Sequence, residues 1–145
     1  MSNLRRSFLF ILAAIVLIIA YGCKKDDSNP TASGDDLVGT WVLTKVIVIT
    51  PQGKVNYTPQ QAGITMTVTL RSDKTYQQTQ TTNGQTTNES GTWSVSNGSI
   101  IANATTGTTM TLPYRVNGNI LQLDSTTTDP STGAVLPMTL EYTKQ

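Results

Sequence analysis

Apolar and polar residues alternate along most of the chain after residue 36. The clearest run is ITMTVTLR (64–71), in which Ile, Met, Val and Leu alternate with Thr and Arg, and TMTLPYRV (109–116) repeats the pattern. A period of two is typical of strands that bury one face and expose the other. Pro113 cannot donate to a ladder, so it predicts an edge, a bulge or a kink there. The sequence therefore predicts an all-β domain.

Turn signals divide this region into segments. Asn-Gly stands at 83–84, 97–98 and 117–118, and RSDK (71–74) and DPSTG (129–133) are two further turn sequences. The predicted strands are 38–49, 64–71, 74–82, 86–95, 99–103, 108–117, 119–127 and 134–143. The connection over 50–63 is the longest and could hold a short extra strand or a turn of helix.

Eight strands joined mostly by tight turns predict an up-and-down meander. Such a meander hides its edges completely by closing into an antiparallel barrel, and eight strands leave an interior that side chains or one small ligand can fill. A two-sheet β-sandwich is the alternative, because alternation alone does not separate the two.

The N-terminal segment has a different pattern. Arg5 and Arg6 precede thirteen apolar residues, FLFILAAIVLIIA (8–20). This order is typical of a secretory signal peptide, and the run is shorter than the ~20 residues that a membrane-spanning helix needs.

The signal ends in AYGC (20–23), which resembles the bacterial lipobox, although Ala20 and Tyr21 depart from its commonest residues. The resemblance implies that residues 1–22 are a cleaved lipoprotein signal peptide and that Cys23 carries lipid. The membrane is then a partner through that lipid, since two or more acyl chains anchor a protein durably. The alternative is that Cys23 is a buried structural thiol or remains in an uncleaved segment.

A charge cluster follows the cysteine. The run CKKDD, with Lys24, Lys25, Asp26 and Asp27, resembles the surface-export signal of Bacteroidetes lipoproteins. It implies a lipid-anchored protein of the bacterial outer membrane, exposed on the cell surface. The alternative is a solvated charge cluster without an export role. SNPTASGDD (28–36) is typical of a linker, so we expect a lipidated flexible tether over 23–36 and the barrel domain over 37–145.

The composition narrows the chemistry. A formal net charge of +1 gives no basic footprint for nucleic acid. The absence of histidine excludes a Ser-His-Asp triad and the usual zinc or copper sites, and the single cysteine excludes an internal disulfide. We therefore expect no catalytic residues, no metal, no cofactor and no enzymatic activity.

Four segments carry a family resemblance. LVGTWVLTKV (37–46), TLRSDKTY (69–76), SGTWSV (90–95) and YRVNGNILQLD (114–124) resemble the small lipocalin-like domains of Bacteroidetes lipoproteins. That resemblance implies a barrel in which a basic side chain, Arg115 or Lys144, covers Trp41. One departure is that Lys74 follows Asp73 where the family has Gly, so that turn must be built differently.

Four aromatic residues are the candidates for ligand contact. Trp41, Tyr76, Trp93 and Tyr114 could surround a cavity that binds a small apolar or amphipathic ligand. Alternatively, they plug the closed end of the barrel and fill its core. In that case the protein is a packed barrel without a lumen that acts, through an unidentified protein partner, as an accessory or interaction protein in an outer-membrane assembly.

Overall fold

The computed structural model describes residues 34–145. The predicted signal peptide, Cys23 and the charge cluster from Lys24 to Asp27 lie outside the described residues. The strands are β1 (Gly39–Thr50), β2 (Gly53–Tyr57), β3 (Ile64–Leu70), β4 (Thr75–Thr82), β5 (Gln85–Ser96), β6 (Ser99–Ala104), β7 (Thr109–Asn117), β8 (Ile120–Thr128) and β9 (Val135–Lys144). All eight predicted strands are confirmed to within one residue at each end, and β2 is the short extra strand in the longest connection.

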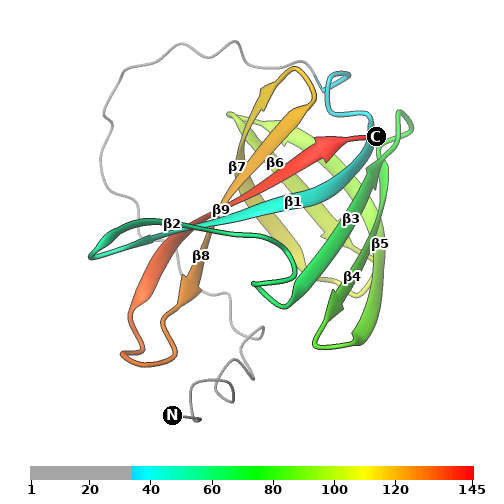
Figure 1. Ribbon diagram of the computed structural model, residues 1–145. Coiled ribbons are helices and arrows are strands. Elements are labelled where there is room, and N and C mark those ends of the chain that lie inside the picture. Colours follow the sequence, from blue (N-terminus) through cyan, green and yellow to red (C-terminus); the bar gives the residue numbers. More distant parts are fainter. Residues whose placement is uncertain (1–33) are drawn as a thin grey trace.

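The strands close into an antiparallel barrel (Figure 1). Neighbours pair in the order β1-β3-β4-β5-β6-β7-β8-β9, and β9 pairs again with β1. The predicted barrel is therefore confirmed and the sandwich alternative is wrong. The described residues form no helix, and hence none long and apolar enough to cross a membrane.

Part of the sheet continues beyond the barrel. β1 pairs with β3 only over 39–42, whereas its second half, 46–50, pairs with β2. Likewise, β8 pairs with β7 only up to Leu123, whereas its pairing with β9 continues to Thr128. We call the four segments 46–50, 53–57, 124–128 and 135–140 the extension; Figure 1 shows it projecting from the barrel at the lower left.

Pro113 lies where β7 changes partner. Residues 109–113 pair with β6, and the ladder to β8 begins at the next residue, Tyr114. A residue without an N–H is tolerated at this junction because a continuous ladder on both sides is not required there. This junction accounts for the irregularity that Pro113 predicts.

Two of the three Asn-Gly turns are confirmed as predicted. Asn83–Gly84 and Asn97–Gly98 all have positive φ, as a type I′ hairpin requires. The third prediction is wrong by one residue. Asn117 pairs with Ile120, so the loop is Gly118 and Asn119, and only Gly118 has positive φ.

The turn at 71–74 shows how the missing glycine is replaced. Lys74 itself takes a left-handed conformation, with φ of 66°. The Asp73 carboxylate accepts hydrogen bonds from the Thr75 backbone N–H (2.9 Å) and hydroxyl (2.6 Å). These bonds lower the pKa of Asp73 and hold the turn in shape.

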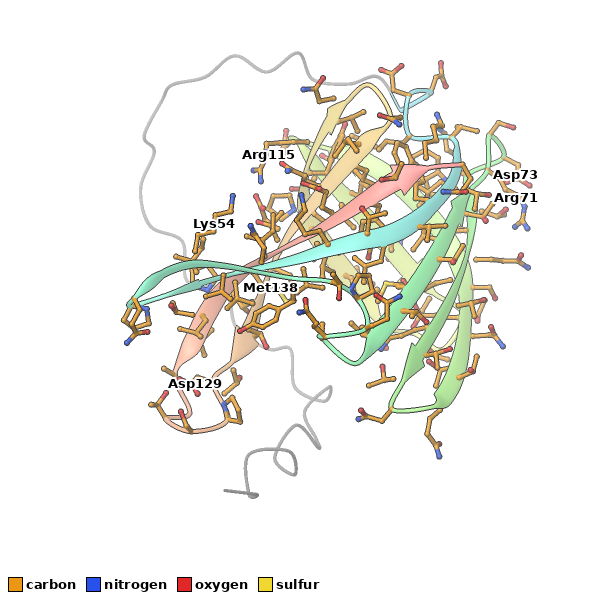
Figure 2. All side chains as sticks on the ribbon, in the orientation of Figure 1. Lys54, Arg71, Asp73, Arg115, Asp129 and Met138 are labelled. Carbon is orange, nitrogen blue, oxygen red and sulfur yellow. The ribbon has the colours of Figure 1, made fainter. Side chains whose placement is uncertain are left out.

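The core lies inside the barrel. Residues two apart on a strand share a face, and residues of the inward faces supply nearly all of the core. Figure 2 draws the side chains on both faces of the strands. The buried cluster consists of Leu37, Trp41, Leu43, Val46, Leu70, Tyr76, Trp93, Ile100, Tyr114, Leu121, Leu123 and Tyr142.

Candidate functional site

The two ends of the barrel differ, and each is defined by its loops. One end carries the entry of the chain before β1, the β3–β4, β5–β6 and β7–β8 turns and the C-terminus. The other carries the β2–β3 loop, the β4–β5 turn and the β6–β7 and β8–β9 loops. We call them the closed end and the open end, because the largest wholly buried side chains all lie toward the first: Leu37, Trp41, Trp93, Leu121 and Tyr142.

Trp41 seals one side of the closed end. It is 0% exposed, and its indole N–H donates to the carbonyl of Leu37 at 2.7 Å. The Lys144 ammonium lies 5.2 Å from the centre of the indole ring and donates to the carbonyl of Asp36 at 3.1 Å. Lys144 is therefore the basic residue that covers this tryptophan. The other candidate, Arg115, makes a two-pronged ion pair with Asp124 on the outer face.

Trp93 seals the other side in the same way. It is 2% exposed, and its indole N–H donates to the carbonyl of Arg71 at 3.1 Å. The Lys74 ammonium lies 4.4 Å from the ring centre. Each Gly-Thr-Trp segment thus supplies one tryptophan whose N–H is bound to backbone and whose ring face meets a lysine.

Tyr76 and Tyr114 lie in the same buried cluster. The Tyr76 hydroxyl donates to Oε1 of Glu89 at 2.6 Å, and burial, together with this carboxylate, raises the pKa of Tyr76. Burial also raises the pKa of Tyr114. All four predicted aromatic residues therefore lie in one buried cluster, where they fill the closed end and the core of the barrel. Their contact with a ligand stays a prediction.

The open end has a partly exposed apolar wall. Side chains there pack against the core and keep some exposure; they include Val48, Tyr57, Ile64, Met66, Leu112 and Met138. Tyr142 reaches from the core toward this wall, with its hydroxyl 2.9 Å from the sulfur of Met66. The apolar groups of this wall therefore keep some contact with solvent, and we take the open end as the candidate binding site. The alternation on 64–71 signalled Ile64 and Met66 as sharing one buried face, but not their exposure.

The β4–β5 hairpin adds a polar wall. Its sequence from 77 to 90, QQTQTTNGQTTNES, contains no apolar side chain on either face. Gln78 and Gln80 follow Tyr76 on the inward face and pair across the hairpin with Glu89 and Thr87. Sequence reasoning missed this wall, although an all-polar hairpin without apolar alternation was its available signal.

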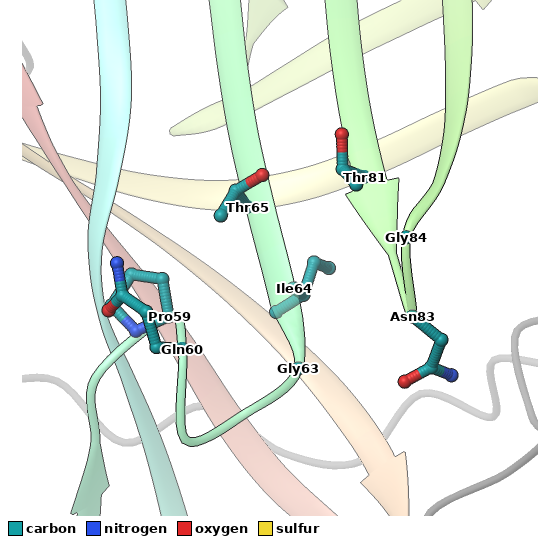
Figure 3. Close-up of a pocket in the computed structure, with 8 residues that line it drawn as sticks. All are labelled: Pro59, Gln60, Gly63, Ile64, Thr65, Thr81, Asn83 and Gly84. Carbon is teal, nitrogen blue, oxygen red and sulfur yellow. The ribbon is translucent and has the colours of Figure 1, made fainter.

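A shallow hollow lies at the rim of the open end. Figure 3 shows its lining residues on the β2–β3 loop and around the β4–β5 turn. The hollow has a volume of about 230 Å³. Its lining consists of Pro59, Gln60, Gly63, Ile64, Thr65, Thr81, Asn83 and Gly84. Ligand pockets usually enclose ~300–1,000 Å³, so the hollow alone is small for a site and contains none of the four predicted aromatic residues.

The carboxylates of the described residues do not form a cluster. Between residues 34 and 145 no three His, Cys, Asp or Glu side chains gather where they could hold an ion. Asp73 and Asp129 cap turns, and Glu141 is tied to Lys45 at 2.7 Å. The carboxylates are thus spread among separate structural contacts.

Comparison with known proteins supplies the family. No curated protein matches the chain. The family model described as "NlpE N-terminal domain" matches residues 59–133, from the β2–β3 loop to the β8–β9 loop. That span is more than half of the 145 residues and includes the polar hairpin, Trp93 and Tyr114. The chain belongs to the NlpE N-terminal domain family, whose members are β-barrel lipoproteins.

Proposed function

We propose that this protein is a lipid-anchored, surface-exposed lipoprotein of the outer membrane whose barrel binds a small amphipathic ligand at its open end. The observation that carries the proposal is the contrast in burial. The tryptophans of the closed end are wholly buried, whereas Ile64, Met66 and Met138 line the open end only partly buried. The proposal includes no catalytic step.

The physical reason is the free energy of exposed apolar surface. Each Å² removed from water contributes roughly 25 cal/mol, and a ligand's hydrocarbon portion would cover the side chains that the barrel leaves exposed. Methionine suits such a wall because its flexible thioether adapts to different shapes, and the wall contains both Met66 and Met138.

Native mass spectrometry of the domain purified from its own host tests ligand binding. We expect a co-purifying small molecule on the intact domain and loss of that adduct in Met138→Glu, which places a charge on the apolar wall. A substitution on the opposite, exposed face of the same strand, Val135→Glu, is the matched control. A domain free of adduct that also fails to bind an apolar dye would contradict the proposal. Tryptophan fluorescence is a poor reporter, because both indoles lie at the closed end.

Family membership and the sequence of the first 27 residues support the anchoring. The family consists of lipoproteins, and the AYGC and CKKDD runs resemble a lipobox and a Bacteroidetes surface-export signal. Mass spectrometry of the mature protein should find acylated Cys23 at the N-terminus. Protease treatment of intact cells should remove the barrel domain, and replacing Lys24–Asp27 with Ser and Gly should protect it. An unmodified Cys23 with the signal still attached would end the anchoring claim.

A second candidate function is an accessory role in an outer-membrane assembly. The extension exposes Ile49 (44%) and Val135 (68%), and β2 pairs within the described residues only with β1. An exposed strand edge beside apolar side chains is a surface where another chain can add a strand. Photo-crosslinking from position 135 on living cells tests it: one reproducible partner would favour this role, and no partner would favour the ligand binder.

A further inference from the structure

We propose that the ligand's head group is a hydrogen-bond donor, an amine or a hydroxyl, and that Glu89, Gln78 and Gln80 recognise it. This rests on the proposed ligand-binding function and goes further by assigning the chemistry of the polar end of the ligand. Its basis is the inward face of the β4–β5 hairpin.

The hairpin places these three polar groups on one face. Gln78 and Gln80 lie two and four residues after buried Tyr76, so they share its inward face. Glu89 stands directly opposite Gln78 in the ladder, and it is held there by the 2.6 Å bond from the Tyr76 hydroxyl to its Oε1. The carboxylate is therefore positioned by the core and not by solvent.

Much of the acceptor capacity of this face is unused. Within residues 34–145, Oε2 of Glu89 accepts no hydrogen bond and the carboxylate makes no ion pair. The Gln80 amide nitrogen donates to Thr82, which leaves its carbonyl oxygen as an acceptor, and the Gln78 side chain makes no hydrogen bond to a described residue. The partly buried carboxylate of Glu89 has the hydrogen bond from Tyr76 but no cation partner among the described residues. A ligand that donates hydrogen bonds would supply the missing partner.

The neighbouring strand explains why the ligand is amphipathic. In the β3–β4 ladder, Met66 stands opposite Gln80 and Val68 opposite Gln78. The polar row and the apolar row therefore run side by side along the inner wall. A head group on β4 and β5 would leave its hydrocarbon chain on β3, toward Met66 and Met138.

The charge of this wall disfavours anionic head groups. Among the described strands, Glu89 is the only carboxylate on the inward face, since Asp124 and Glu141 bind Arg115 and Lys45 on the outer face. Lys144, the inward cation, is engaged with Trp41 at the closed end. A fatty-acid carboxylate at the open end would therefore meet a like charge without a compensating cation.

The test compares how tightly three probes with ten-carbon chains bind the same barrel domain. Decylamine, decyl glucoside and decanoate, each kept below its micelle concentration, compete with a bound apolar dye on the whole domain at neutral pH. We expect decylamine and decyl glucoside to bind about tenfold more tightly than decanoate, the change that 1.4 kcal/mol produces. General attraction to a chain of net charge +1 would act in the opposite direction.

Substitutions separate the two head groups. Glu89→Gln should remove the advantage of decylamine, retain the binding of decyl glucoside and keep an acceptor for the Tyr76 hydroxyl. Gln78→Ala should weaken decyl glucoside several-fold. Gln77→Ala, on the same strand but the exposed face, is the matched control and should change none of the three affinities.

The outcomes distinguish the inference from the function on which it rests. If the dye binds but decanoate competes as well as decylamine, or if the decylamine advantage survives in Glu89→Gln, the head-group assignment is wrong and the binding function stands. If neither dye nor any probe binds the folded barrel, the proposed function fails, and this inference fails with it.

Discussion

The two ends of this barrel differ in how completely their side chains are buried. At the closed end, each Gly-Thr-Trp segment places an indole beneath a lysine and binds its N–H to a backbone carbonyl. At the open end, the strands that would complete the wall diverge: β1 leaves β3 for β2, and β8 continues past its ladder with β7. The largest wholly buried side chains are therefore concentrated at one end, and the other end retains partly exposed apolar side chains.

This difference shows what the buried aromatic residues contribute to the barrel. Large aromatic side chains contribute most where they are wholly desolvated and their polar atoms are satisfied, which is the condition of Trp41 and Trp93. Binding instead needs groups that folding leaves unsatisfied. In our proposal these groups are Gln78, Gln80 and Glu89, which keep acceptor atoms without a described partner, together with the half-buried methionines.

The largest difference in the free energy of unfolding should come from removing one large side chain at each end. Trp41→Ala empties a wholly buried site and should lower the free energy of unfolding by about 3–5 kcal/mol. Met138→Ala, on the partly exposed wall, should cost below about 2 kcal/mol. Urea unfolding followed by circular dichroism measures both. Equal losses would show that the open end is packed as tightly as the closed one.

The second contrast concerns Gly91, where β5 passes from the polar hairpin to the closed end. Gly91 pairs both with Tyr76 on β4 and with Ala104 on β6. A Cβ there would clash with the backbone carbonyl of Asn103, so β5 and β6 could not approach as closely as they do. We expect Gly91→Ala to cost about 1–3 kcal/mol and to raise hydrogen exchange along β6.

Gly84→Ala is the matched control for Gly91. It lies in the open-end turn, where a methyl group on its Cα would meet nothing within 4 Å, but its φ is +79°. The backbone penalty alone should be about 1 kcal/mol, without a change in exchange along β6. A cost at Gly84 that exceeds the cost at Gly91 would contradict the close approach of β5 and β6.

The strands could be predicted because their signals are local. Alternation on 64–71 and the Asn-Gly turns at 83 and 97 depend on neighbours in the chain, and both are confirmed. The predicted position of the third turn is wrong by one residue. Gly118 can supply positive φ as either the second or the first residue of a two-residue loop, and only the register of β7 against β8 shows that it is the first.

The candidate site was harder to predict because it depends on closure. The sequence shows that 77–90 is polar, but only the barrel makes one face of that hairpin an inner wall beside Met66. Lys144 lies 103 positions after Trp41 in the chain, so its selection over Arg115 also required the pairing of β9 with β1.

A smaller change in the free energy of unfolding is expected at Lys74, where two substitutions separate backbone strain from the cation–π contact. Lys74 has a left-handed backbone, and its ammonium lies over Trp93. Lys74→Ala loses the cation–π contact, worth ~0.5–1 kcal/mol, and keeps the strain. Lys74→Gly loses the same contact but relieves about 1 kcal/mol of strain. Urea unfolding should therefore rank the glycine variant near the wild type and the alanine variant lowest. An alanine variant more stable than the glycine variant would show that the turn carries no strain.

The smallest effect is expected on the outer face, in the strands that connect the barrel to the extension. Hydrogen bonds from Lys45 and Gln122 lower the pKa of Glu141 below its ordinary value of 4.5. Because the folded-state pKa is the lower one, this stabilisation is fully present above pH 4.5 and is lost as the pH falls through the folded-state pKa. Lys45 is 43% exposed, so the loss should be at most about 1 kcal/mol. Urea unfolding of the wild type and Glu141→Gln between pH 7 and pH 3 measures it, and the two curves should converge in acid because both then lack the carboxylate. Parallel curves would show that the Lys45–Glu141 contact does not stabilise the root of the extension, and the difference between the two ends would then depend on inward-facing residues alone.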